Sequence, residues 1–193
     1  MKKIVLASGS PRRKMLLEWA EIPFEVIVSD IDESFPIGTY PADAALLIAK
    51  NKNFAISNQL NISSPDSERI IISADTIVVL GDEIIGKPND HEHAIETLRK
   101  LSGQKHAVMT AVVMKSSSKE ISFIDTTYVT FNDLTEDQIK HYVTKYKPFD
   151  KAGSYAIQEW IGVIGIKSID GDFYNVMGLP ISRVIRMLYT AFN

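Results

Sequence analysis

The chain has 193 residues, of which 45% are hydrophobic and 23% charged, with a formal net charge of -3 and a pI near 5.8. This acidic balance argues against a nucleic-acid-binding surface built on bulk charge, so we expect a small-molecule partner and no nucleic acid. The absence of cysteine excludes disulfides, thiolate catalysis and cysteine-based zinc sites, and because no apolar run approaches ~20 residues we expect no membrane contact and a cytoplasmic location.

The first half of the chain mixes strands and helices. Ser10 suits the cap and Pro11 the first turn of an early helix, and Asp90 suits the cap of a later one. Periodicity predicts strand 2–8, a helix from 11, strand 24–28, helix 41–59, loop 61–68, strand 69–80, a hairpin return at 83–85 and a helix to 101. The longest helix is expected to turn four side chains inward: Leu47, Ile48, Phe54 and Ala55.

The second half begins with strand-like runs and ends with a helix. Thr135 and Gln138 form a capping box for a helix that runs to about residue 146. The other predicted elements are strands 106–115, 121–125, 127–131, 155–157 and 162–169, and a last helix over 180–191. Strict strand–helix alternation is missing, so we expect an α/β fold with a mixed, twisted sheet and flanking helices, in a single domain over 1–193.

The segment ASGSPRRK, residues 7–14, predicts an anion site. A strand that ends in small residues and leads into a helix places Ser8, Ser10 and free backbone N–H groups at the positive helix end. Arg12 and Arg13 occupy the same first turn, where positive charge is unfavourable unless an anion offsets it. The alternative is that Ser10 is only a cap and both arginines are solvated.

Carboxylates at two places predict a site for a divalent cation. Asp75 closes the apolar run 70–74, where a lone carboxylate is costly unless it is paired or binds metal. Glu33 belongs to the acidic segment 30–33, and with Asp75 it could supply the oxygens that Mg²⁺ or Mn²⁺ accepts. The alternative for the acidic segment is a solvated turn.

Lysines and histidines are less informative. Lys50 and Lys52 fall late in the long helix, and Lys87 falls in a loop, but the pattern does not rank them. The spacing of residues 81–87 matches a P-loop, yet Pro88 stands where that loop needs a hydroxyl for Mg²⁺. The four histidines show no ligand pair on one helix face.

Eight short motifs, in order, resemble the Maf family of nucleoside triphosphate pyrophosphatases. They are LASGSPRR at 6–13, DES at 32–34, ADT at 74–76, GKP at 86–88, LSG at 101–103, DKAG at 150–153, YAIQ at 155–158 and GLP at 178–180. The resemblance implies a fold related to the inosine triphosphate pyrophosphatases, with two lobes around a cleft. It also implies a divalent metal cation and hydrolysis of a nucleoside triphosphate to the monophosphate and pyrophosphate.

The DKAG and YAIQ motifs are similar to those of the family's dTTP and UTP branch. By the resemblance, Asp75 matches the proton acceptor. The positions that match pyrimidine choice are Arg12, Thr76 and Gln158, and those that match the rest of the site are Ser8, Arg13, Glu33, Lys52 and Lys87. The chain departs from the family at Ala156, Glu159 and Ala111, where glycine is usual, and Glu159 stands beside the base-reading position.

Residues and resemblance together predict one mechanism. Lys52 and Lys87 neutralise a triphosphate that Ser8, Ser10 and Arg13 hold, while Glu33 and Asp75 hold the metal or the attacking water. Gln158 offers the donor and acceptor that suit the O4 and N3–H edge of uracil or thymine. A pyrophosphatase for purine or modified nucleotides, a non-enzymatic nucleotide-sensing regulator of septum formation and a homodimer stay open.

Overall fold

The computed structural model describes residues 2–62 and 69–192, which divide into two units. The first comprises Met1–Asp75, Thr110–Asp125 and Gly178–Asn193, and the second Thr76–Met109 and Thr126–Met177. Residues 63–68, most of the predicted loop, lie outside the described residues. The long strands β3, Arg69–Leu80, β5, Lys105–Lys115, and β6, Glu120–Phe131, contribute residues to both units.

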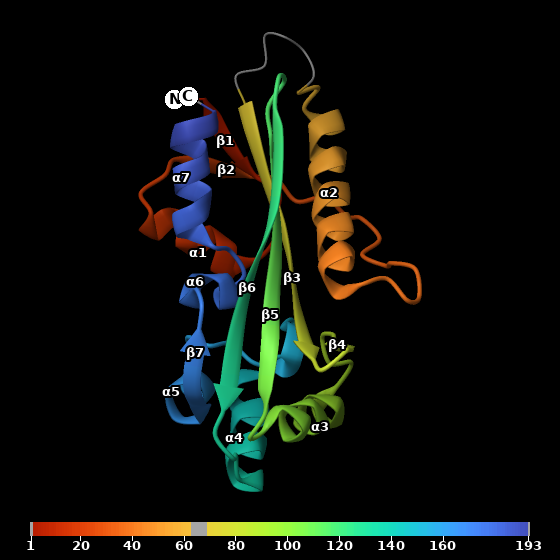
Figure 1. Cartoon of the computed structure of the whole chain (residues 1–193), viewed down its shortest axis with the longest axis vertical. Helices are drawn as coiled ribbons and strands as arrows, with labels where there is room; N and C mark the ends of the chain where they lie inside the picture. Colours follow the sequence, from red (N-terminus) through yellow and green to blue (C-terminus); the bar gives the residue numbers. More distant parts are fainter. Residues whose placement is uncertain (1, 63–68, 193) are drawn as a thin grey trace. The chain divides into compact units, whose positions relative to one another are not determined.

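The first unit is built on two parallel strand pairs. The strand β1, Lys3–Leu6, lies between β2, Phe24–Val26, and β3, and pairs in parallel with both. The strand order in this unit is β2-β1-β3-β5-β6. Its helices are α1, Pro11–Trp19, α2, Pro41–Gln59, and α7, Ile181–Ala191. Figure 1 shows α2 on one side of the strands and α7 on the other.

The buried face of α2 combines alanines and two isoleucines with Asn53 and Ser57, which corrects part of the predicted one. Ile48 is buried as expected, but Leu47 and Phe54 are exposed, the latter by 63%. Their place toward the sheet is taken by Asn53, which is 1% exposed and whose Nδ2 donates to Ile71 O and Val113 O, both at 3.2 Å. Hydrophobic periodicity alone assigns such an asparagine to solvent, because it does not see the backbone carbonyls that satisfy the amide.

The second unit combines an antiparallel hairpin, short helices and an antiparallel last strand. Its strands are the remainder of β3, β4, Glu83–Ile85, and β7, Ile166–Asp170, with β5 and β6. The strand β4 pairs antiparallel with β3, and β7 antiparallel with β6. The helical elements are α3, His91–Leu101, α4, Glu136–Tyr146, η1, Ala152–Ser154, α5, Trp160–Gly165, and α6, Phe173–Met177. Parallel and antiparallel pairs therefore occur together, and the predicted mixed sheet with flanking helices is confirmed.

Local signals predicted several elements correctly. The helix α2, the hairpin of β3 and β4, and α3 have the predicted bounds, and Asp90 accepts a hydrogen bond of 2.8 Å from His93 N. The capping box is present, since Thr135 Oγ1 accepts from Gln138 N at 3.2 Å and Thr135 N donates to Gln138 Oε1 at 2.8 Å. No helix within the described ranges is both long and apolar enough to cross a membrane.

The strand boundaries differ most from the prediction in three places. Residues 121–125 and 127–131 are strand as predicted, but they belong to one continuous strand, β6, in which Asp125 pairs with Arg183 at 3.3 Å. Residues 155–157 form no strand, and 162–165 are helical in α5. Tyr155 instead packs edge-on against Phe131, at 5.1 Å between ring centroids.

A buried histidine belongs to the same aromatic cluster in the second unit. His106 is 1% exposed, stacks on Phe131 at 5.6 Å, and its Nε2 shares a hydrogen bond of 2.8 Å with the hydroxyl of Tyr155. Burial lowers the pKa of His106 from 6.5 to about 4 and raises the pKa of Tyr155. His106 is therefore neutral in the folded protein at neutral pH.

We predict that His106 makes the protein sensitive to mild acid. Its contribution to stability is complete above pH 6.5 and is lost as pH falls through 6.5 toward 4, because the unfolded chain then binds a proton that the folded chain does not. Urea unfolding at pH 7 and pH 4.5 should show an acid-induced loss of unfolding free energy that is smaller by about 2 kcal/mol in His106→Gln than in the wild type. The exposed His141→Gln is the control, and equal losses in all three proteins would contradict the prediction.

Candidate functional site

The turn after β1 is organised by a serine hydroxyl. Ser8 is 7% exposed, and its Oγ accepts hydrogen bonds from Ser10 N and Arg13 Nη1, both at 3.2 Å. Ser10 occupies the cap position of α1 with extended backbone angles, but its side chain makes no capping hydrogen bond. The segment therefore forms the predicted strand-to-helix turn, and the hydroxyl that shapes it is that of Ser8.

Arg13 is a buried cation, so the alternative in which both arginines are solvated is wrong for this residue. It is 7% exposed, and its Nε donates to Gly178 O at 2.8 Å. Burial lowers the pKa of Arg13, the negative charge of Asp75 opposes that shift, and the charge of Arg12 adds to it. Arg12 itself is half-buried. An arginine fixed at a helix start beside a second arginine is suited to an anion.

Asp75 lies in the middle of β3 and does not close the strand, which corrects the prediction. It is 8% exposed, and its Oδ1 accepts a hydrogen bond of 2.8 Å from Lys52 Nζ. The same Nζ lies 2.7 Å from Glu33 Oε1. Two carboxylates from distant parts of the sequence thus meet at one ammonium group supplied by α2. A buried carboxylate in a strand is tolerated because this cation is present.

Strand register brings this ion cluster to the edge of the sheet where β1 ends. Leu6 is the register partner of Ile72 in the parallel pair, so Ser8 follows the end of β1 while β3 continues past it through Asp75. The carboxyl ends of parallel strands in open α/β sheets are common ligand sites, and of this pair only β1 ends here. Arg13 and Lys52 balance the charges of Asp75 and Glu33, and a divalent cation or an anion that enters would alter this balance.

A local turn holds Glu33 in its extended segment. Asp32 Oδ1 accepts from Ser34 N at 2.8 Å and Asp32 Oδ2 accepts from Ser34 Oγ at 2.8 Å. These hydrogen bonds lower the pKa of Asp32. Glu33 is the residue between them, and its side chain is 43% exposed. The acidic segment is therefore a structured turn that directs one carboxylate to Lys52.

The donor set fits a divalent cation. Oxygens of Glu33 and Asp75 lie within 2.7 and 2.8 Å of one atom, Lys52 Nζ, so they already converge on a single position of positive charge. Mg²⁺ and Mn²⁺ prefer carboxylate oxygens, and Mg²⁺ commonly binds through one or two of them together with substrate phosphates. The predicted metal ligands are thus brought together.

The remaining predicted site residues belong to the second unit. Thr76 follows Asp75 and is half-buried, and Lys87 is exposed after β4. The loop of Lys87 is anchored by a hydrogen bond of 3.1 Å from Gly153 N to Gly86 O. Gln158 is half-buried, and its Oε1 is a buried acceptor without a hydrogen-bond partner. Their predicted participation with the residues of the first unit stays a prediction.

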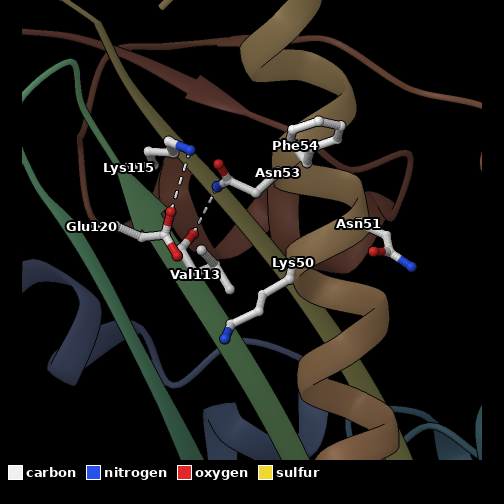
Figure 2. Close-up of a pocket in the computed structure, with 7 residues that line it drawn as sticks. All are labelled: Lys50, Asn51, Asn53, Phe54, Val113, Lys115 and Glu120. Atoms are coloured by element: carbon white, nitrogen blue, oxygen red, sulfur yellow. Dashed lines mark hydrogen bonds and ion pairs between the residues drawn. The ribbon is translucent and has the colours of Figure 1, made fainter. Parts of the chain in front are cut away.

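Lys50 contributes to a separate pocket in the first unit. The pocket has a volume of about 270 Å³, and its lining is Lys50, Asn51, Asn53, Phe54, Val113, Lys115 and Glu120. Figure 2 shows the Lys50 side chain on the same side of α2 as Lys115 of β5 and Glu120 of β6, which pair at 3.3 Å. The two lysines that the sequence could not rank are therefore distinguished, since only Lys52 meets the carboxylates.

Sequence reasoning gave no role to Gly178 and none to the side chain of Lys151. Gly178 is buried, with a φ of +113°, and its carbonyl oxygen accepts from Arg13. Lys151 is 8% exposed, and its Nζ lies 2.7 Å from Asp150 Oδ1 and 3.6 Å from Glu159 Oε1. The sequence feature that could have indicated Gly178 is its place before the buried segment 179–181. No local pattern distinguishes Lys151 from a solvated lysine.

Comparison with known proteins gives matches along nearly the whole chain. A family model described as "Maf-like protein" matches residues 3–191. A dTTP/UTP pyrophosphatase of Cytophaga hutchinsonii is 47% identical over 190 residues, which cover 98% of this chain and 84% of the relative. A dTTP/UTP pyrophosphatase of Bacillus cereus is 46% identical over 188 residues, which cover 97% of this chain and 95% of the relative.

Two solved structures are distantly similar. The Ham1 protein of Staphylococcus aureus has a TM-score of 0.43 at 18% identity, and the similarity covers 68% of this chain and 73% of that protein. The dITP/XTP pyrophosphatase of Mycobacterium abscessus has a TM-score of 0.40 at 13% identity, with 68% and 75% covered.

We predict that Lys52 is required for stability and that Lys50 is not. Lys52→Met leaves Asp75 buried without its cation, which should lower the free energy of unfolding by about 2–4 kcal/mol. Lys50→Met, on the same helix, should change it by less than about 0.5 kcal/mol. Urea unfolding at pH 7 measures both variants. A Lys52→Met protein as stable as the wild type would show that Asp75 does not depend on this pair.

Proposed function

The chain belongs to the Maf family, and from that premise we propose that it is a hydrolase that converts dTTP and UTP to the nucleoside monophosphate and pyrophosphate. In this reaction the anhydride bond between the α- and β-phosphates breaks and one water molecule is consumed. The observation that carries the proposal is the ion cluster at the end of β1, where Lys52 joins Asp75 to Glu33 beside the buried Arg13. The names of the relatives at 47% and 46% identity support the substrate class.

Residues of the turn after β1 hold the triphosphate. Arg13 is held by hydrogen bonds to Gly178 O and Ser8 Oγ. Its guanidinium is therefore already ordered, so that binding of a phosphate costs little side-chain entropy. Ser8, Ser10 and the first N–H groups of α1 add hydrogen-bond donors, and the positive end of the helix favours the anion. Lys87 adds positive charge from its loop. Fixed cations of this kind stabilise the charge that develops on the leaving pyrophosphate.

Glu33 and Asp75 hold a divalent cation, Mg²⁺ or Mn²⁺. When bound, such a cation supplies neutralisation of phosphate charge and activation of a water molecule. A carboxylate is a weak base at neutral pH, so Asp75 orients the attacking water and accepts its proton only as the new bond forms. Lys52, already within hydrogen-bond distance of Asp75, turns from neutralising the carboxylates to neutralising the phosphates.

The base is recognised by Gln158, with Arg12 and Thr76 as further determinants of pyrimidine choice. The buried, unpartnered Oε1 of Gln158 supports this assignment, because an acceptor without a partner costs free energy until a donor reaches it. The N3–H group of uracil or thymine is such a donor. The amide nitrogen of the same side chain can donate to O4.

A cytoplasmic location and a homodimer belong to the same proposal. Nucleoside triphosphates are the substrates of the reaction, and we place the enzyme in the compartment that contains them, where it would remove unwanted nucleotides from the pool. Light scattering at micromolar concentration tests the homodimer. A regulator of septum formation without enzymatic activity is the competing function, and the ion cluster favours the enzyme because a purely sensing protein does not need an aligned carboxylate pair.

The proposal predicts pyrophosphate release from UTP and dTTP that depends on a divalent cation. A panel of UTP, dTTP, CTP, ATP, GTP and dITP is assayed with Mg²⁺, with Mn²⁺ and with a chelator. We expect kcat/KM for UTP and dTTP to exceed the others by at least about tenfold, the equivalent of ~1.4 kcal/mol of discrimination. A preference for a purine nucleotide would contradict dTTP and UTP as the substrates. No turnover of any nucleotide would favour the non-enzymatic regulator.

Replacing one carboxylate tests the assigned chemistry. Asp75→Asn should lower kcat for UTP by at least about 10³-fold while the Kd of the nucleotide changes by less than about tenfold, because the triphosphate is held by other residues. Rapid-quench turnover and calorimetric titration give the two quantities. Asp43→Asn, on the exposed side of α2, is the matched control. Loss of binding with unchanged turnover at saturation would refute the role of Asp75.

A further inference from the structure

Gln158 is carried by a four-residue turn. Residues 156–159 form this turn, which is closed by a hydrogen bond of 3.0 Å from Glu159 N to Ala156 O. Gln158 is the third residue, at the corner. Ala156 and Glu159 are the first and last residues of the turn. The ends of the turn therefore decide where the base-reading amide lies.

One phenolic oxygen joins the two ends of the turn. The hydroxyl of Tyr142 accepts a hydrogen bond of 3.1 Å from Ala156 N and donates a hydrogen bond to Glu159 Oε2. Tyr142 is completely buried in α4, and its ring stacks on that of Tyr146 at 5.0 Å. The hydroxyl is thus held by a rigid helix, and the turn is held by the hydroxyl. These two hydrogen bonds restrain the backbone of residues 156–159.

The carboxylate that receives this hydrogen bond is also paired with a buried cation. Lys151 Nζ lies 3.6 Å from Glu159 Oε1 and 2.7 Å from Asp150 Oδ1. Glu159 stands at the cap position of α5 but makes no side-chain capping bond, since its side chain is engaged with Tyr142 and Lys151. The hydrogen bond from the phenol fixes the direction of the carboxylate, and the ammonium at 3.6 Å adds electrostatic attraction.

The turn is also packed against α5 without spare room. A Cβ atom at Gly162 would lie 1.8 Å from Ile157 O, a distance that no side chain tolerates. The backbone of the turn therefore rests directly on the helix that follows it. Together with the Tyr142 hydroxyl, this contact restrains the turn from two sides.

We propose that Tyr142, Glu159 and Lys151 form a positioning network that fixes Gln158 and thereby sets the preference for uracil or thymine over cytosine. The inference rests on the proposed function, because it assumes that Gln158 reads the base. Uracil presents an N3–H donor and an O4 acceptor, whereas cytosine presents an acceptor and an amino donor at the same places. Discrimination between these opposite patterns needs a side chain that starts from a fixed backbone position, and the restrained turn provides that position for Gln158. None of the three residues is assigned contact with the reacting phosphates.

The test is the ratio of kcat/KM for UTP to kcat/KM for CTP in matched variants. Tyr142→Phe removes only the hydroxyl and should lower the ratio about three- to tenfold, the range for one or two lost hydrogen bonds. Glu159→Ala should do the same. Glu159→Gln keeps an acceptor for Tyr142 but loses the charge paired with Lys151, so its ratio should lie between those of Glu159→Ala and the wild type. Tyr146→Phe, one turn further along α4, is the control and should leave the ratio unchanged.

A double-mutant cycle separates a failure of this inference from a failure of the proposed function. If the network acts through Gln158, adding Tyr142→Phe to Gln158→Ala should not lower the ratio further. A lowered ratio in Gln158→Ala with an unchanged ratio in Tyr142→Phe and Glu159→Ala would overturn the network alone. Equal losses for UTP and CTP in Tyr142→Phe would reduce its role to structure and also overturn it. Equal losses in Gln158→Ala would refute base reading, and the network's role with it.

Discussion

The single constraint on which the first unit depends is the burial of Asp75 in the middle of β3. A carboxylate at this place needs a cation, and Lys52 of α2 provides it at 2.8 Å. For Lys52 to point inward, the neighbouring turn of α2 must also face the sheet, which is why Asn53 is buried and bonds two strand carbonyls. The same ammonium draws Glu33 from its turn to 2.7 Å. One buried charge is thus joined through Lys52 to a helix and to an acidic segment, which brings both predicted metal ligands to one ammonium group.

Much of the fold was predictable because its signals are local. Caps at Asp90 and Thr135, the hairpin at Gly81 and the apolar run of β3 depend on residues within a few positions of each other, and all were placed correctly. The buried face of α2 was not predicted correctly. Asn53 can be buried there because its amide donates hydrogen bonds to the carbonyl oxygens of residues 71 and 113, which are distant in the sequence. The composition of segment 155–157 predicts a strand, yet the segment leads into a turn. Its Tyr155 packs against His106 and Phe131, which are distant in the sequence.

The candidate site also contains residues that were predictable from local patterns and residues that were not. Ser8, Arg13 and Asp75 were found from the sequence, because a strand-to-helix turn and a carboxylate in an apolar run are readable patterns. Residue pattern alone did not separate Lys52 from Lys50, and the resemblance that singled out Lys52 and Glu33 gained a physical basis only through the Lys52 contacts and the Asp32 turn. The surroundings of Gln158 could not be predicted at all, since Tyr142 lies 14 positions before the Ala156 N–H that it accepts. Glu159, the charged residue beside Gln158, is paired with Lys151 and Tyr142.

The central claim is that the cluster of Ser8, Arg13, Lys52, Asp75 and Glu33 is where a triphosphate and a divalent cation meet. A crystal structure of the protein with Mn²⁺ and a UTP analogue whose α–β bridge is an imido group tests it most directly, because both ligands are observed without turnover. The account predicts manganese density bound to oxygens of Glu33 and Asp75, phosphate oxygens on Ser8 and Arg13, and Lys52 Nζ moved from the carboxylates to a phosphate. A triphosphate bound elsewhere, with Lys52 still between Glu33 and Asp75, would contradict it.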